Sequence, residues 1–147
     1  MSDKALVWQH IFNINTTPGG TETMSRLAAG LSSVEFSNNE EVDQTAYLDG
    51  EGFSSSDVTG GQMILSFSGH RDYDDAAQNY IYSLLTEFGE SRKTNFEWTT
   101  PNGDEFTGNI TIANIEGPSG DANTKGEISF EIHFNGKPVF TPAPVTP

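Results

Sequence analysis

Hydrophobic and polar residues alternate along most of the chain, a pattern typical of β-strands with one buried face. The alternation is most regular near the end, where Ile128, Phe130, Ile132 and Phe134 alternate with Glu127, Ser129, Glu131 and His133. Further strands are expected around residues 6–14, 34–36, 62–69, 93–99 and 106–112. The turn at residues 101–104, Pro-Asn-Gly-Asp, is the strongest hairpin signal in the sequence. The pattern predicts a mainly β fold.

One segment, residues 73–88, has helical spacing instead. Its apolar side chains recur every three or four positions, at Ala77, Tyr80 or Ile81, Leu84 or Leu85, and Phe88. Asp72 or Asp74 can cap the start of this helix, and Gly89 can end it in a left-handed conformation. We therefore expect a single α-helix beside the strands.

Residues 37–61 are rich in Asn, Ser, Asp and Gly and are expected to form a long loop. Loops of this length are uncommon in compact domains unless they are functional or disordered. Large apolar side chains are costly to leave in water, so we expect this loop to dock on another surface. The residues expected to make that contact are Glu40, Glu41, Asp43, Tyr47, Leu48, Asp49 and Phe53.

The charge of this segment leaves two interpretations open. No Lys or Arg lies between Arg26 and Arg71, while seven acidic residues do. An acidic run of this kind is often only a solubilising surface. Alternatively, the loop meets a basic patch on a partner, for which the candidates are Arg92 with Lys93, or Lys125 and Lys137.

Length and composition indicate one domain with a thin core. The chain has 147 residues, of which 34% are hydrophobic, so one core suffices and support from neighbouring subunits is expected. We assign residues 1–137 to this domain. Residues 138–147 contain four prolines and are expected to form an extended tail that joins no sheet interior.

Net charge and cysteine content exclude several classes of function. A formal charge of −14 argues against a protein that grips nucleic acid by neutralising its phosphates. The absence of cysteine excludes disulfides, thiol chemistry and cysteine-based zinc sites. Neither a signal peptide nor a bilayer-spanning segment is recognisable, so we expect a protein made in the cytoplasm and not bound to a membrane.

No motif predicts an enzyme, a metal site or a cofactor. His10, His70 and His133 lack the spacing of metal ligands. Glu127 and Glu131 would lie roughly 13 Å apart on one strand face, farther than either glycosidase geometry requires. Two weaker alternatives remain: a carbohydrate-binding β-sandwich that uses Trp8, Trp98 and tyrosines, and a glycoside hydrolase that uses Glu97 with another carboxylate.

The ordered segments resemble the major tail tube proteins of long-tailed bacteriophages with non-contractile tails. The resemblance covers roughly residues 5–140 and rests on architecture and short phrases, not on a catalytic signature. The phrases are Val34-Glu35-Phe36, residues 41–50 (EVDQTAYLDG), residues 62–69 (QMILSFSG), the helix at 74–88, and the ending at residues 126–138.

The resemblance implies a β-sandwich or half-barrel with one flanking helix. Members of this family form stacked hexameric rings in which the subunit sheets join into one continuous inner β-barrel. It also implies that the loop at 37–61 reaches the adjacent ring and that the tube, a part of the virion, conducts DNA into the bacterial host. The partners implied are further copies of the chain, a tape measure protein, and tail terminator and distal tail proteins.

Strand alternation then leaves Glu127, Ser129, Glu131 and His133 to face either the lumen or the solvent, and these four are the candidates for the lumen. Acidic groups there would repel DNA and keep it from sticking, which suits a conduit. The tube protein of a related contractile injection or secretion system is an alternative to a phage tail.

Overall fold

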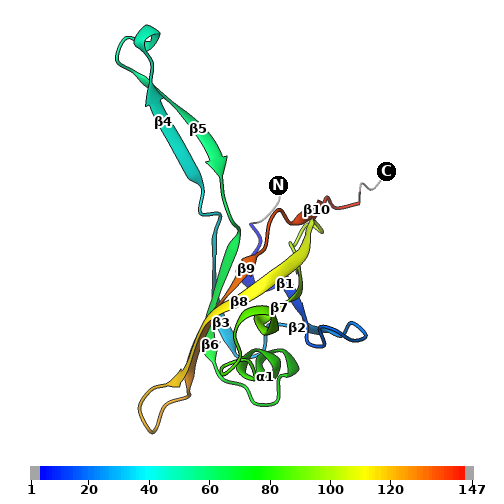
Figure 1. Cartoon of the computed structure of the whole chain (residues 1–147). Coiled ribbons are helices and arrows are strands. Elements are labelled where there is room, and N and C mark those ends of the chain that lie inside the picture. The colour runs from blue at the N-terminus through cyan, green and yellow to red at the C-terminus, as the bar shows by residue number, and fades with distance from the viewer. Residues whose placement is uncertain (1–3, 145–147) are drawn as a thin grey trace.

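The computed structural model describes residues 4–144, which form one curled antiparallel sheet and a projecting hairpin (Figure 1). Eight strands make up the sheet: β1 (Ile11–Asn15), β2 (Met24–Arg26), β3 (Leu31–Ser37), β6 (Ile64–His70), β7 (Lys93–Thr99), β8 (Glu105–Ser119), β9 (Glu127–Phe134) and β10 (Val139–Thr141). Their order is β2-β1-β7-β8-β9-β6-β3, and β10 pairs with β8. The expected mainly β fold is confirmed.

The sheet curls around its core. The long strand β8 joins the two halves of the sheet, β2-β1-β7 on one side and β9-β6-β3 on the other. β8 pairs with β7 as far as Thr111 and with β9 from Ile110 to Ser119. Rings from the two halves meet inside, with the centroids of Phe12 and Phe67 5.0 Å apart. The apolar residues of β9 are all buried in this core, as the alternation predicted. Residues 4–144 thus form a half-barrel whose first and last strands, β2 and β3, do not pair with each other.

The helix α1 (Ala76–Tyr82) is shorter than the expected 73–88. Asp75, not Asp72 or Asp74, caps it by accepting a hydrogen bond from the backbone of Gln78. Beyond Tyr82 the chain continues in turns of the 3₁₀ type, with i to i+3 bonds such as Glu87 N to Leu84 O. Apolar side chains in such turns still recur about every three residues, so the sequence pattern continues although the α-helix has ended. Gly89 has φ +73° but begins the 3₁₀ turn η3 (Gly89–Arg92) instead of capping α1.

Gln78 links α1 to the sheet through buried hydrogen bonds. Its side chain is fully buried and donates to the carbonyls of Ala29 and His70 at 2.7 and 3.1 Å. Its Oε1 accepts from the backbone of Asp72 and from Arg71. A buried amide is stable only with such partners, so this network fixes the helix against β6 and the segment before β3.

Residues 37–61 form a hairpin and not the expected loop. β4 (Glu41–Ala46) pairs with β5 (Ser54–Gly60), and the 3₁₀ turn η2 (Leu48–Gly50) lies at the tip. Figure 1 shows the hairpin projecting far from the body, at the end opposite the β8–β9 turn. Polar residues occupy both faces of this ribbon, so hydrophobic alternation gave no strand signal. Isolated two-stranded ribbons of this kind are only marginally stable in water.

The first strand begins later than expected, and part of the tail pairs with the sheet. Leu6 and Trp8 lie outside the first strand, since a short 3₁₀ turn, η1 (Val7–Gln9), precedes β1. The tail forms the short strand β10, in which Val139 pairs with Thr107 of β8. β10 has a strand on one side only among the described residues, so the tail stays out of the sheet interior. Residues 145–147 of the expected extended tail lie outside the described part.

Candidate assembly surfaces

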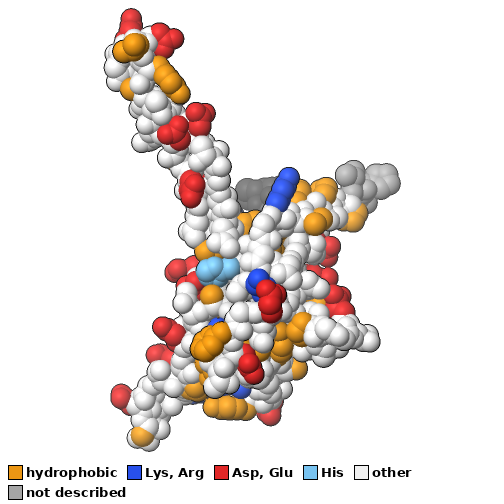
Figure 2. Space-filling view, viewed as in Figure 1, with side chains coloured by type: hydrophobic (Ala, Val, Ile, Leu, Met, Phe, Trp, Pro, Cys, Tyr) orange, Lys and Arg blue, Asp and Glu red, His pale blue; other side chains and the backbone are white. Residues whose placement is uncertain are grey.

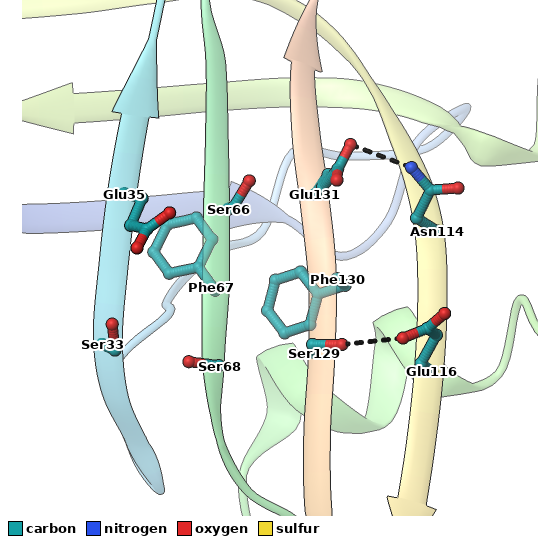
Figure 3. Close-up of a pocket in the computed structure, with 10 residues that line it drawn as sticks. All are labelled: Ser33, Glu35, Ser66, Phe67, Ser68, Asn114, Glu116, Ser129, Phe130 and Glu131. Carbon is teal, nitrogen blue, oxygen red and sulfur yellow. Dashed lines mark hydrogen bonds between the residues drawn. The ribbon is translucent and has the colours of Figure 1, made fainter.

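A polar face runs across the four strands β3, β6, β9 and β8, opposite the core (Figure 3). The pairing places Ser66 beside both Glu35 and Glu131, and Ser129 beside Ser68 and Glu116. The face contains two shallow hollows of about 450 and 400 Å³. Their polar side chains are those of Ser32, Ser33, Glu35, Ser66, Ser68, His70, Asn114, Glu116, Ser119, Glu127, Ser129 and Glu131.

The sequence-derived candidates for this face occupy one side of β9. Glu127 is exposed, and Ser129, Glu131 and His133 are half-buried by their neighbours. The structure adds Glu35, Asn114 and Glu116, which the sequence did not bring together. Alternation along residues 62–69 assigned Ser66 and Ser68 to the polar side of their own strand. The sequence did not show that β3, β6, β9 and β8 lie side by side and form one continuous polar face.

Hydrogen bonds hold Glu131 at the centre of this face. His133 Nε2 lies 2.7 Å from Glu131 Oε1, and the Asn114 amide donates to the same oxygen at 2.9 Å. These bonds, that from His133 first, lower the pKa of Glu131 below its usual value. Glu131 is therefore ionised at neutral pH. No Lys or Arg lines either hollow, so the face is acidic.

The hairpin tip exposes an apolar cluster. Leu48 is fully exposed, and Phe53 and Tyr47 are 80% and 63% exposed. Asp49 and Glu51 flank these side chains. The acidic residues Glu40, Glu41 and Asp43 lie at the base and along β4, away from this cluster. The tip thus has the composition of a contact site, with an apolar centre and a charged rim.

An apolar groove lies between the N-terminal segment and the β2–β3 region. It has a volume of about 650 Å³, and its lining includes Val7, Trp8, Leu27 and Val34. Trp8 is 72% exposed although it is a large aromatic residue. The charged or titratable groups in the lining are Arg26 and His10, and no Asp or Glu contributes. In a chain of charge −14, this groove is an unusual surface.

His10 and Trp98 connect the groove to the core. The Trp98 indole N–H donates to His10 Nδ1 at 3.0 Å, and Trp98 stacks on Phe106 with centroids 4.9 Å apart. Burial lowers the pKa of His10, which favours the neutral ring that can accept this bond. Trp98 is therefore a packing residue, and its indole does not offer the open platform expected of a carbohydrate site.

Glu97, the carboxylate named for a glycoside hydrolase, lies half-buried on β7. Burial raises the pKa of Glu97, with smaller contributions from Glu105 and Glu22. No group of His, Asp or Glu side chains within residues 4–144 could hold a metal ion. No helix in that part is long and apolar enough to cross a membrane.

Solved structures with similar architecture come from tail and injection assemblies. A chain of the tail of an empty gene transfer agent particle, refined with helical and C6 symmetry, has a TM-score of 0.75 and 17% identity over 95% of this chain and 100% of its own. A chain of the virion of a native gene transfer agent particle has a TM-score of 0.71 and 17% identity, and the match again covers 95% of this chain and 100% of that one. This chain has a tail tube fold.

A third similar structure extends the comparison beyond tailed particles. A chain of the sheath–tube complex of an extracellular contractile injection system, PVC, in its extended state matches with a TM-score of 0.56 and 13% identity. The match covers 94% of this chain and 91% of that one. No protein-family model matches the sequence, and neither does any curated protein. At these identities, the likeness establishes the fold.

Proposed function

We propose that this protein is the structural subunit of a tail tube, in which six copies form a ring and rings stack into a conduit for DNA. The tail tube fold, shared over nearly the whole chain with a tail of C6 symmetry, is the observation that carries the proposal. The subunit is a component of the virion and works without a cofactor or a catalytic step. Phage tails of the non-contractile type are the expected setting.

The acidic face is the part of the subunit that lines the lumen. Glu35, Glu116, Glu127 and Glu131 present carboxylates there, with Ser and Asn side chains between them. A wall without Lys or Arg offers DNA phosphates no ion pair. The repulsion is screened within about 8 Å at physiological salt, so it prevents adhesion without closing the passage.

The ends of the sheet provide the contacts within a ring. β3 has no strand on its outer side among residues 4–144. At the other end of the polar face, β8 extends past Thr111, where its pairing with β7 stops. Along that edge, Arg92 donates a hydrogen bond to the carbonyl of Ile112 and Tyr82 donates one to the carbonyl of Glu116, so within the described residues side chains and no strand cover this part of β8. Open edges are an aggregation hazard that ring closure removes, and a contact between unlike edges closes a ring without two-fold axes.

The hairpin provides the contact between rings. It projects beyond the body and carries its apolar cluster at the far end (Figure 2). Residues 37–61 lack basic groups and include Glu40, Glu41 and Asp43. The acidic residues can keep the hairpin soluble before assembly, and they can also meet a basic patch when the tip docks on the adjacent ring. A tape measure protein inside the tube, and terminator and distal tail proteins at its ends, are the further partners in this proposal.

Electron microscopy of the purified protein tests the assembly. We expect rings or tubes with six-fold symmetry at high concentration. A particle that stays monomeric at every concentration would contradict the proposal.

The lumen assignment has its own test, in which tubes assemble with short duplex DNA present. The double variant Glu35→Lys and Glu116→Lys should retain DNA, because it places cations on the channel wall. The control variant Asp74→Lys and Glu87→Lys makes the same change in charge at exposed positions beside α1. Equal DNA retention by both variants would show that the polar face does not line the lumen.

The tube of a contractile injection system is the second candidate. The similarity to a chain of the PVC sheath–tube complex supports it. A tube of that kind is enclosed by a sheath, so co-purification of the assembled tube with a sheath protein from the source cells would favour it over the non-contractile tail.

A further inference from the structure

Among residues 4–144, none fills the apolar groove beside the N-terminal segment. Its walls come from η1 with the start of β1 on one side and from residues 26–34 on the other. Arg26 and Leu27 lie beside β1 at one end of the strand order, whereas Leu31 to Val34 belong to β3 at the other end, so the groove marks the place where the half-barrel stays open. An open apolar groove of about 650 Å³ is large enough to receive several side chains.

The hairpin tip is complementary to this groove in both polarity and charge. The tip offers Tyr47, Leu48 and Phe53, and the groove offers exposed apolar side chains such as Trp8. The tip carries Asp49 and Glu51 without a basic residue, whereas the groove carries Arg26 without an acidic one. The groove therefore offers the tip apolar contacts and a positive charge without a carboxylate to repel it.

The tip and the groove that meet must belong to different copies. β4 has six residues, so at about 3.3 Å per residue the paired part of the hairpin holds its tip roughly 20 Å from its base. The tip of a hairpin that remains paired cannot return to the groove of its own body. Joining an outlying tip to a groove on another copy is a head-to-tail contact, which propagates along an assembly instead of closing a dimer.

We propose that the groove is the receptor for the hairpin tip of a second copy of this chain, in the adjacent ring. This inference rests on the proposed tube function and adds the identity of the receiving surface. Tyr47, Leu48 and Phe53 enter the groove, Trp8 becomes buried against them, and Arg26 lies near Asp49 and Glu51. The N-terminal segment thereby takes part in stacking.

Cysteine cross-linking tests the pairing directly, because the natural chain contains no cysteine. Ala28→Cys marks the exposed rim of the groove. Gly50→Cys marks the tip, where an added side chain meets no other atom. When the two single variants are assembled together, with one carrying a tag, we expect a mixed disulfide dimer under oxidising conditions. Such a bond requires Cα atoms within about 7 Å.

A matched partner variant provides the control. Thr124→Cys marks the exposed β8–β9 turn, which lies at the end of the body opposite the hairpin and is the competing receiver (Figure 1). Mixed dimers with Thr124→Cys and none with Ala28→Cys would overturn the inference. Tubes that form without either cross-link would also overturn it, while leaving the tube function intact. Failure of all variants and of the natural chain to form rings would instead count against the tube function.

Charge reversal gives a second readout in the intact chain. Arg26→Glu should raise the concentration of free subunit that coexists with tubes by about 2- to 5-fold, the range of an exposed ion pair. Adding Glu51→Lys should restore it. The tryptophan emission, which comes from exposed Trp8 and half-buried Trp98, should shift to the blue on assembly through burial of Trp8, whereas an unchanged emission together with no charge rescue would refute the docking.

Discussion

Replacing Leu48 by Ser isolates the contribution of the hairpin tip to assembly. Leu48 is fully exposed in the single subunit, so the free energy of unfolding should change by no more than about 0.5 kcal/mol. In the proposed tube, the same side chain would be buried against the adjacent ring. Burying a leucine contributes about 1.5 to 3 kcal/mol, which corresponds to a factor of roughly 10 to 150 in an equilibrium constant.

The assay is sedimentation of assembled tubes followed by measurement of the free subunit that remains. Each added subunit docks one tip, so Leu48→Ser should raise the free concentration by about 10- to 150-fold. Leu48→Met is the control, because it keeps an apolar side chain of similar size and should change the value little. Thermal unfolding of the unassembled subunits should be the same for all three proteins.

One result would refute this reasoning. If Leu48→Ser and the natural chain leave the same concentration of free subunit, the tip is not buried on assembly. The stacking role of the hairpin and the groove as its receptor would then both fail, while rings of six subunits could still form through the sheet edges.

Three further predictions concern the subunit itself. Phe130→Ala should cost about 3 to 5 kcal/mol of unfolding free energy in urea titrations, because Phe130 is buried in the core; a cost below 1 kcal/mol would contradict this. Gly69→Ala should detach β3 from β6, seen as faster hydrogen exchange in β3, since an added Cβ would meet Gly30 O and, at 2.6 Å, Leu31 Cα. Thermal stability should fall as the pH drops below 6.5, because burial lowers the folded-state pKa of His10 and protonation is easier in the unfolded chain; His10→Phe should remove this dependence, and an unchanged pH profile would refute it.

Hydrophobic patterning located β1, β3, β6, β7, β8 and β9 and the buried face of β9, but it missed the short strands β2 and β10. In β9 the apolar residues alternate strictly with polar ones, at Ile128, Phe130, Ile132 and Phe134. Side chains on a strand alternate between its two faces, so only one face can be the buried one. Helical spacing likewise located α1, although not its length. The 3₁₀ turns after Tyr82 keep a similar spacing, so the sequence cannot tell where α-helical hydrogen bonding stops.

The hairpin shows where such patterning fails. Both faces of β4 and β5 are exposed, so no apolar side selects a register and the polar residues between 37 and 61 look like a loop. Backbone pairing alone builds this ribbon. The acidic charge and the three apolar tip residues could nevertheless be read from the sequence, and they are the basis of the docking prediction.

The sequence by itself determined that this is a single acidic, mainly β domain whose last strand has an apolar and a polar face. Only the tertiary structure decided which residues share each surface. Curling of the sheet brings Glu35 and Glu116, distant in sequence, onto the polar face that contains Glu131, and leaves an apolar groove between η1 and residues 26–34. These surfaces depend on long-range strand order, and local periodicity carries no information about which strands become neighbours.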